Sequence, residues 1–448
     1  MKKYILILFV ILLPLMCIAG SVQDMHKVVI ARMNAASNIE ICNNSIDDDS
    51  DGLIDCYDPD CDSETNADSG VCHYVDTLAE LYTAFGSEAN NDIIVVSSGT
   101  YTLNTTALAL NASNVRLWGA TGTKEDVIIQ GDAMTAGASI KYILYIVAAN
   151  TNIHVKDLTM QRVGWHVVGF EGSTSAGTGS TFDNVAFKDA YEQIIKVADS
   201  NSTDGEHVDD VTITNSVIMF SSSPAPQSYT GGIDAHGAQD WIVRGNTFQN
   251  ITSPDTSPGE GAVHFWQGSA NNLVEKNRII DCDRGIEFGR ADGASCTGDG
   301  LCGNSAGIIR NNMIFHSGQG TLEDVQIAAQ NSPNTEIYNN TIYMVDSAYA
   351  NAIEGRWSSS TGLLIQNNLI AGGAIQLRDS SSGTVSYNVT NAEGDWFVDV
   401  VTGDSSDLHL AGTEETVIDQ GANVSGLTDD YDGDSRQTDE IDIGADEA

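Results

Sequence analysis

A short unit, apolar-x-x-Asn-x-apolar, recurs along the chain and constrains its fold more than any other feature. Its asparagines are Asn246, Asn277, Asn312, Asn340 and Asn368, so the unit returns after 31, 35, 28 and 28 residues. A repeat of this length indicates a solenoid in which each repeat forms one coil. Short β-branched segments separated by Gly, Asn and Ser turns argue against a helical repeat. We expect the asparagines to form a ladder between stacked coils and not a binding site.

Earlier copies of the unit extend the repeat toward the N-terminus, with Leu158, Val185 and Ser216 in place of the asparagine. The pattern is similar to that of the right-handed parallel β-helix superfamily, which holds pectate, alginate and chondroitin lyases and mannuronan C5-epimerases. The resemblance implies an all-β right-handed parallel β-helix, which we assign to residues 73–410. A capping-box pattern at Thr77 predicts a short helix that caps the open end of the solenoid.

The terminal segments are assigned from their composition. Residues 1–19 have the basic start and apolar core of a secretory signal peptide, with lipidation of Cys17 as the alternative. Residues 20–39 are expected to be a linker, and residues 411–448 an acidic segment that caps the last coil or forms a disordered tail. Because no other segment is apolar enough to span a bilayer, we expect a soluble protein that is secreted, periplasmic or on the outer surface of a bacterial cell.

Residues 40–72 form an acidic module that holds four of the eight cysteines. In an exported protein, clustered cysteines indicate disulfides. The candidates are Cys42, Cys56, Cys61, Cys72, Cys296 and Cys302. Their connectivity stays open, and free thiols are the alternative for the last two. Cys282 lies in an apolar strand and is expected to be a buried small hydrophobe.

The same module contains a loop that matches the EF-hand pattern, with Gly52 at its sharp turn and Ile54 at its hydrophobic position. The candidate ligands are Asp47, Asp49, Asp51 and Asp58. The segment 40–61 resembles the acidic, Cys-flanked calcium repeats of exported bacterial proteins. Ca²⁺ is therefore the expected cofactor and would rigidify a module with little apolar content, whereas a solvated acidic loop is the alternative.

A second strand precedes each strand with an asparagine, and its alternate residues face away from the core. The first outward column is Lys196, Asp234, His264, Glu287, Gln326, Glu354 and Gln376. The second outward column is Ala198, His236, Trp266, Gly289, Ala328, Arg356 and Arg378. Polarity on an outward face has no functional meaning by itself, but the clustering of histidine and tryptophan favours a functional groove.

Asp234 and His236 share one face of a strand and look like the Asp-x-His element of the C5-epimerases, with Ala235 in place of its Pro. That family's catalytic Tyr has no assigned position here, and Tyr229 is a candidate because it lies nearby in sequence. The resemblance implies a reaction in which the substrate carboxylate is neutralised and a base removes the adjacent C5 proton. An acid then completes either a lyase or an epimerase reaction.

The strip supplies groups for each of these roles. The catalytic candidates are Lys196, Asp234, His236, His264 and Arg356. The substrate-binding candidates are Trp266, Glu287, Glu354 and Arg378. Either histidine can act as the base, the cations can hold the carboxylate, and the acids can orient a histidine or bind Ca²⁺. The tryptophan can cover a sugar ring.

The charge of the chain limits its partners. A formal net charge of −42, from 62 acidic and 20 basic residues, argues against nucleic acid. We expect a monomer that binds or acts on an anionic polysaccharide or a cell-surface glycan. Whether it is an enzyme stays open. The alternatives are a non-catalytic surface or adhesion protein that binds glycan and Ca²⁺, a structural rod, and a glycoside hydrolase that uses Asp234 and Glu287.

Overall fold

The computed structural model describes residues 40–147, 151–171, 176–198, 207–290, 303–318, 322–344, 349–401, 406–412 and 414–448. The predicted signal peptide and linker lie outside these residues, as does the candidate pair Cys296 and Cys302. No helix in the described part of the chain has the length and apolar character that crossing a lipid bilayer requires.

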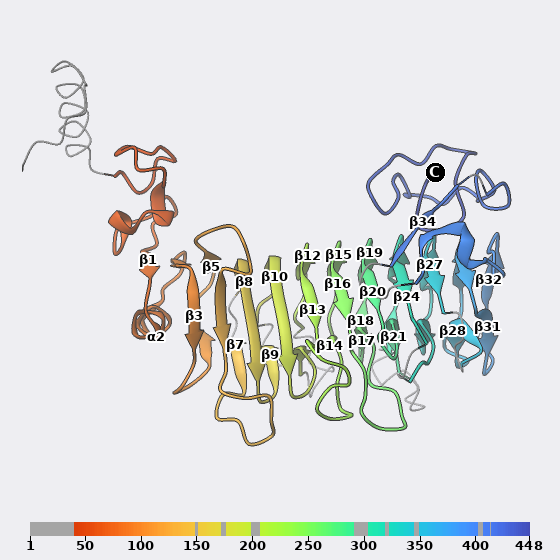
Figure 1. Cartoon of the computed structure of the whole chain (residues 1–448), viewed down its shortest axis with the longest axis horizontal. Helices are drawn as coiled ribbons and strands as arrows, with labels where there is room; N and C mark the ends of the chain where they lie inside the picture. The colour runs from red at the N-terminus through yellow and green to blue at the C-terminus, as the bar shows by residue number, and fades with distance from the viewer. Residues whose placement is uncertain are drawn as a thin grey trace, which may run out of the picture.

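The chain winds into stacked coils whose strands form two long sheets (Figure 1). The 10-stranded sheet contains β4 (Leu108–Leu110), β7 (Tyr142–Ile146), β9 (His166–Phe170), β11 (Ile195–Val197), β14 (Ile233–His236), β17 (Val263–Trp266), β21 (Ile286–Gly289), β25 (Ile327–Gln330), β28 (Asn351–Arg356) and β31 (Ala374–Arg378). The 20-stranded sheet contains β1 (Cys72–Val75), β2 (Ile93–Val96), β3 (Gly99–Thr102), β5 (Arg116–Gly119), β6 (Val127–Gln130), β8 (His154–Val163), β10 (Thr181–Ala190), β12 (Thr212–Thr214), β13 (Val217–Met219), β15 (Ile242–Arg244), β16 (Thr247–Gln249), β19 (Leu273–Glu275), β20 (Arg278–Ile280), β23 (Ile308–Arg310), β24 (Met313–Phe315), β26 (Glu336–Tyr338), β27 (Thr341–Tyr343), β29 (Leu363–Gln366), β30 (Leu369–Ala371) and β32 (Gly383–Ser386).

The remaining elements are short. They are α2 (Leu78–Ser87), the 3₁₀ helices η1 (Asp55–Tyr57), η2 (Pro59–Cys61) and η4 (Gly394–Trp396), the parallel pair β18 (Ser269–Ala270) and β22 (Asn304–Ser305), and the antiparallel pair β33 (Phe397–Asp399) and β34 (Asp407–Leu410). In both long sheets each strand pairs in parallel with strands of the neighbouring coils; β11, for example, lies between β9 and β14. The predicted parallel β-helix is therefore confirmed.

The asparagine ladder is also confirmed. Each side-chain amide donates to the side-chain oxygen of the next asparagine at 2.9–3.1 Å, through Asn246, Asn277, Asn312, Asn340 and Asn368. Asn388 adds a further step at 2.9 Å. The amides also donate to backbone carbonyls, as Asn312 does to Val274 at 2.9 Å. Because the five asparagines from Asn246 to Asn368 are buried and hydrogen-bonded to one another, the ladder joins the coils and is not a binding site.

The predicted capping helix is α2. The hydroxyl of Thr77 accepts from the backbone N–H of Glu80 at 3.3 Å, and the carboxylate of Glu80 accepts from the N–H of Thr77 at 3.0 Å. Leu81 and Phe85 are buried in the same hydrophobic core as the first coils. The helix therefore shields the apolar interior at the N-terminal end of the solenoid.

The predicted outward columns are confirmed except at one strand. Ile286 pairs with Ile327 and Glu287 with Ala328, so β25 is shifted by two residues from the predicted alignment of Gln326 with Glu287. The second column accordingly contains Gln330 instead of Ala328. A shift of two preserves the alternation of inward and outward side chains, so the apolar pattern alone does not distinguish the two registers.

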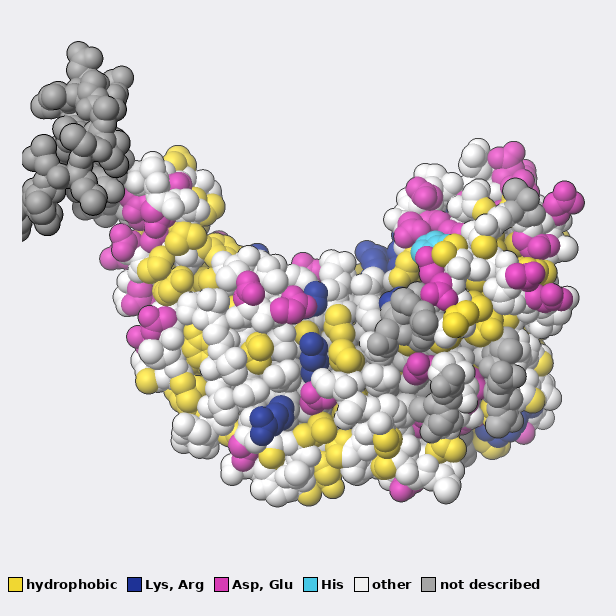
Figure 2. All heavy atoms as spheres, viewed as in Figure 1, with side chains coloured by type: hydrophobic (Ala, Val, Ile, Leu, Met, Phe, Trp, Pro, Cys, Tyr) yellow, Lys and Arg dark blue, Asp and Glu magenta, His cyan; other side chains and the backbone are white. Residues whose placement is uncertain are grey.

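The two acidic ends of the chain pack against the outside of the 20-stranded sheet. In the N-terminal module, Tyr57 stacks on Trp118 with ring centroids 5.4 Å apart. In the C-terminal segment, Val417 and Ile443 join a separate cluster with Phe315. Figure 2 shows acidic side chains gathered at these two ends and a more mixed surface between them.

Candidate functional site

The candidate site lies on the outward face of the 10-stranded sheet, where four adjacent strands present Lys196, Asp234, His264 and Glu287 in one column. His236 and Trp266 pair in the second column. These side chains point away from the apolar core, yet Asp234 is fully buried and its neighbours in the column are nearly so. The strip is therefore a packed polar cluster and not the open row of charges that its polarity suggests.

Lys196 and Asp234 form the centre of this cluster. The ammonium of Lys196 contacts Oδ2 of Asp234, and the indole of Trp266 donates to Oδ1 at 2.7 Å. Burial alone would raise the pKa of Asp234, but its hydrogen bond with His236 and the charge of Lys196 hold that pKa well below its usual value. Burial would lower the pKa of Lys196, and the Asp234 carboxylate reverses this and raises it. The two groups are thus a stable ion pair near neutral pH.

Two further groups lie within reach of the same ammonium. Nζ of Lys196 is 3.1 Å from Nε2 of His236 and 3.5 Å from the hydroxyl of Tyr229. Tyr229 is 47% exposed, and the side chain of His236 is 13% exposed. Nε2 of His236 also lies 3.6 Å from Oδ1 of Asp234, so the ring borders both members of the ion pair. The structure thus brings Tyr229 to the Asp-x-His element, a relationship that the sequence left open.

His264 occupies a different environment from His236. Its Nε2 is 2.9 Å from the carbonyl oxygen of Gly289, and its ring stacks on Trp266 with centroids 5.4 Å apart. Burial lowers the pKa of His264, so the ring is neutral and donates from Nε2. Its buried Nδ1 has no hydrogen-bond partner among the described residues.

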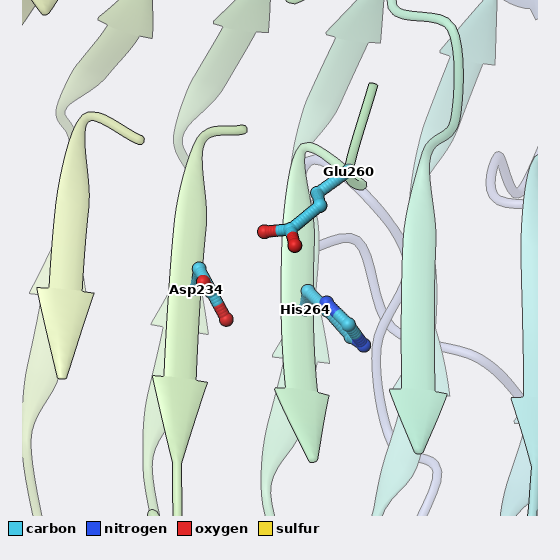
Figure 3. Close-up of side chains that lie close together, drawn as sticks. All are labelled: Asp234, Glu260 and His264. Atoms are coloured by element: carbon cyan, nitrogen blue, oxygen red, sulfur yellow. The ribbon is translucent and has the colours of Figure 1, made fainter. Parts of the chain in front are cut away.

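Glu260 was not predicted from the sequence. It precedes β17, and its carboxylate lies with Asp234 and His264 in a group whose ligand atoms are within 4.8 Å of one another (Figure 3). Burial, followed by the charge of Asp234, raises the pKa of Glu260 to about 8. Gln193 donates to it at 3.1 Å. The glycines on either side of it, Gly259 and Gly261, are the feature of the sequence that could have marked this position. An alignment of the strands of successive coils does not include a residue in a loop.

A pocket of about 590 Å³ extends from this cluster toward the C-terminal coils. Its lining includes Tyr229, Glu260, His264, Arg284, Glu287, Arg290, Asp324, Gln330, Tyr349, Glu354 and Arg356. Its charges are largely paired within the protein. Arg284 binds Asp324 at 2.7 Å and lies 3.4 Å from Glu287. Arg356 binds Asp379 at 2.8 Å.

The predicted site residues therefore fall into two groups. Lys196, Asp234, His236, His264 and Trp266 lie together, with Glu287 on the next strand. Arg356 and Glu354 lie on β28, four strand spacings from Asp234, which is about 19 Å between backbones. Arg378 donates to Glu354 at 3.0 Å, one strand farther away. Arg356 and Glu354 consequently belong to the distal part of the pocket, and Arg378 contacts it through Glu354.

Trp266, which the sequence predicts as a platform for a sugar, is packed against the side chains of this cluster. Its ring contacts His236 with centroids 4.2 Å apart, and the guanidinium of Arg290 lies 4.4 Å from its centroid. With His264 stacked on it and its N–H on Asp234, Trp266 positions the ionisable groups.

The N-terminal module brings its predicted metal ligands together. The disulfides Cys42–Cys61 and Cys56–Cys72 close it, which gives the connectivity of these four cysteines. Oxygens of Asp47, Asp49 and Asp51 form one group within 4.8 Å, and Glu40, Asp49 and Asp58 form a second. Oδ2 of Asp58 is buried without a hydrogen-bond partner in the described part of the chain. This donor set fits a hard cation such as Ca²⁺, which prefers several oxygen ligands.

Cys282 is a free, buried cysteine, as predicted. Burial raises the pKa of its thiol above the usual value, so it is unreactive.

Comparison with known proteins concerns the fold. Residues 168–320 match the model of a family described as "Right handed beta helix region". No curated protein sequence matches the chain. Solved structures with a similar fold include an alginate lyase from Paenibacillus sp. str. FPU-7, with 15% identity, a TM-score of 0.46, and coverage of 71% of this chain and 98% of that one.

Pectate lyase Pel9A gives 14% identity, a TM-score of 0.42, and coverage of 82% of this chain and 90% of that one. The N-terminal fragment of bacteriophage Phi29 gene product 12 gives 11% identity, a TM-score of 0.45, and coverage of 82% and 68%. The two parallel sheets and the family model that matches residues 168–320 together show that the chain folds as a right-handed parallel β-helix.

Proposed function

We propose that this protein binds an anionic polysaccharide along the 10-stranded sheet and removes the C5 proton from one of its uronate residues. The observation that carries the proposal is the position of the Lys196 ammonium. It contacts Asp234 and lies within 3.5 Å of both His236 and Tyr229. One buried cation thus connects a carboxylate, an imidazole and an exposed phenol, which are the groups that a proton transfer next to a carboxylate needs.

His236 is the base in this proposal. A substrate carboxylate that binds the Lys196 ammonium would replace the contact between Lys196 and His236, and Nε2 of His236 would then take the C5 proton. The ammonium stabilises the negative charge that develops on the substrate carboxylate as the C5–H bond breaks. His264 is the weaker candidate, because it is more deeply buried and its Nε2 is bound to Gly289.

Tyr229 is the acid. Its hydroxyl either protonates the leaving glycosidic oxygen, which gives a lyase, or returns a proton to the opposite face of C5, which gives an epimerase. Glu354 and Arg356 are too far away to act on the same sugar and would bind a neighbouring residue of the chain. The lining of the pocket runs from Tyr229 to Arg356 in this direction.

Two cation sites are part of the proposal. Asp234, Glu260 and the unpartnered Nδ1 of His264 would hold a divalent cation in the groove, where it would help to neutralise a substrate carboxylate. The module would hold Ca²⁺ through Asp47, Asp49, Asp51 and Asp58. The two disulfides support export to an oxidising compartment, where such polymers occur.

Glycan binding without chemistry is the second candidate function. It is favoured by the pairing of the pocket arginines, since Arg284 and Arg356 already bind Asp324 and Asp379. A protein of this kind would bind the polymer saturably and leave it unchanged.

The two functions are separated by product analysis on alginate, pectate, chondroitin and ulvan, with and without Ca²⁺. Ultraviolet absorbance of an unsaturated product identifies a lyase, and NMR of recovered polymer identifies an epimerase. We expect His236→Ala to abolish either signal. His154→Ala is the matched control, because His154 lies on the other sheet with Thr181 as its partner. Saturable binding of a polymer that stays chemically unchanged would support glycan binding without chemistry.

A further inference from the structure

The 10-stranded sheet carries a group of aromatic side chains on the N-terminal side of the ionisable cluster. Tyr142 and Tyr145 extend from β7, and their rings stack with centroids 4.7 Å apart. Trp165, just before β9, meets the ring of Tyr142 edge to face at 5.8 Å. Trp165 is 40% exposed, and both tyrosines are partly exposed. We call Tyr142, Tyr145 and Trp165 the aromatic patch.

The aromatic patch continues the column that contains the proposed catalytic groups. Tyr145 pairs with Gly169, Gly169 with Lys196, and Lys196 with Asp234. Gly169 leaves the space that the rings occupy, because a Cβ there would lie 2.6 Å from the ring of Tyr142 and 3.1 Å from that of Tyr145. The rings therefore cover the position next to Lys196, and no side chain of β9 separates them from it in the column.

A chain of ring and hydrogen-bond contacts also joins the patch to the cluster. His166 lies 5.7 Å from the ring of Tyr142, and its Nδ1 is 2.8 Å from the carbonyl oxygen of Gln193. The amide of Gln193 in turn donates to Glu260. The patch and the cluster are thus parts of one packed surface.

We propose that the aromatic patch is a sugar-stacking subsite that holds a residue of the same polysaccharide chain on the N-terminal side of the reacting uronate. This inference rests on the proposed function. Pyranose rings present C–H faces that pack on exposed aromatic rings, which accounts for three such rings at one end of a polar groove. Nζ of Lys141 lies 5.2 Å from the ring centroid of Trp165 and can meet the carboxylate of a uronate stacked there.

If the aromatic patch is a subsite, the two ends of the groove differ in the side chains that they offer to a bound chain. Tyr145 is three strand spacings from Asp234, about 14 Å between backbones. A single monosaccharide does not span this distance, so the patch and the cluster are occupied together only by an oligosaccharide. The arginine-containing pocket lies on the other side of the cluster. A bound chain would therefore rest on aromatic rings at one end and on charged side chains at the other.

The test measures binding and not turnover. Calorimetry gives the affinities of the His236→Ala protein for oligoalginates and oligogalacturonates of two to eight residues. The same affinities are then measured after Trp165→Ala and Tyr145→Ala are added to this protein. We expect the double substitution to weaken binding of the longest oligosaccharides by roughly tenfold, with short ones much less affected. Trp165→Phe should restore most of the loss from Trp165→Ala. Gly169→Ala, which displaces the rings, should reproduce it.

Tyr387→Ala is the control, because Tyr387 is 59% exposed and follows β32 of the other sheet. Unchanged affinities in Trp165→Ala and Tyr145→Ala, with wild-type binding intact, would overturn the subsite and leave the proposed reaction standing. Loss of long-chain affinity in these variants, together with a wild-type protein that leaves every polymer of the panel unchanged, would support the subsite and overturn the reaction. A protein that binds none of these oligosaccharides would overturn both.

Discussion

The indole N–H of Trp266 donates a hydrogen bond of 2.7 Å to Oδ1 of Asp234, a carboxylate on the preceding coil. The other oxygen of this carboxylate faces Lys196. Trp266 therefore sets the orientation of the ion pair that, in turn, lies against His236 and Tyr229.

Trp266→Phe keeps a ring on His264 but removes this hydrogen bond. We expect kcat to fall by about tenfold with KM little changed, since a bond to a buried carboxylate contributes about 1.5–3 kcal/mol and acts here through the catalytic groups. Steady-state kinetics on the active polymer check this. Trp396→Phe, in the cluster under the C-terminal segment, is the control. A change confined to KM would show that Trp266 contacts substrate instead.

Lys196→Met leaves Asp234 as a buried charge that has lost its cation. We expect a loss of about 3–5 kcal/mol in the free energy of unfolding, measured by urea denaturation. Adding Asp234→Asn should recover part of it, because the uncompensated charge is then gone. Lys188→Met on β10 is the control, since Lys188 is only partly buried on the other sheet. A cost below about 1 kcal/mol would mean that the pair is accessible to water.

Asp58→Asn tests the cation site of the module. Ca²⁺ at 100 times its Kd stabilises the folded protein by about 2.7 kcal/mol, so a chelator should lower the melting temperature. The substitution should remove the part of that response that comes from the module. Asp60→Asn is the control because Asp60 is exposed and its backbone N–H, which binds Asp58, is unchanged. Equal melting temperatures of the wild-type protein with Ca²⁺ and with chelator would contradict the site.

The buried side chain of His166 should make part of the free energy of unfolding sensitive to acid. Burial lowers its pKa from 6.5 to about 4, so the unfolded chain takes up a proton between these values while the folded chain does not. Stability is therefore lost as the pH falls from 6.5 toward 4, by up to roughly 3 kcal/mol. In His166→Gln the melting temperature should fall less between pH 7 and pH 5. An identical fall in both proteins would assign the acid sensitivity to other groups.

The fold and most of the strip could be predicted because both depend on regular periods. The recurring asparagine marked the coils, and the alternation along each strand placed Asp234 and His264 in one column. Gln326 was misplaced because a slip of two residues preserves that alternation. Glu260 lies in a loop, where no sequence repeat marks its position. The contacts of Trp266 depend on how side chains pack in three dimensions, which a strand alignment does not give.

Proton NMR of a uronate polymer incubated in D₂O tests the central claim most directly, because both a lyase and an epimerase must break the C5–H bond. We predict that the C5–H signal of one polymer in the panel decreases with the wild-type protein and persists with His236→Ala. An undiminished C5–H signal on every polymer would contradict the account. New reducing ends in that case would indicate hydrolysis, and binding without any change would indicate a glycan-binding protein.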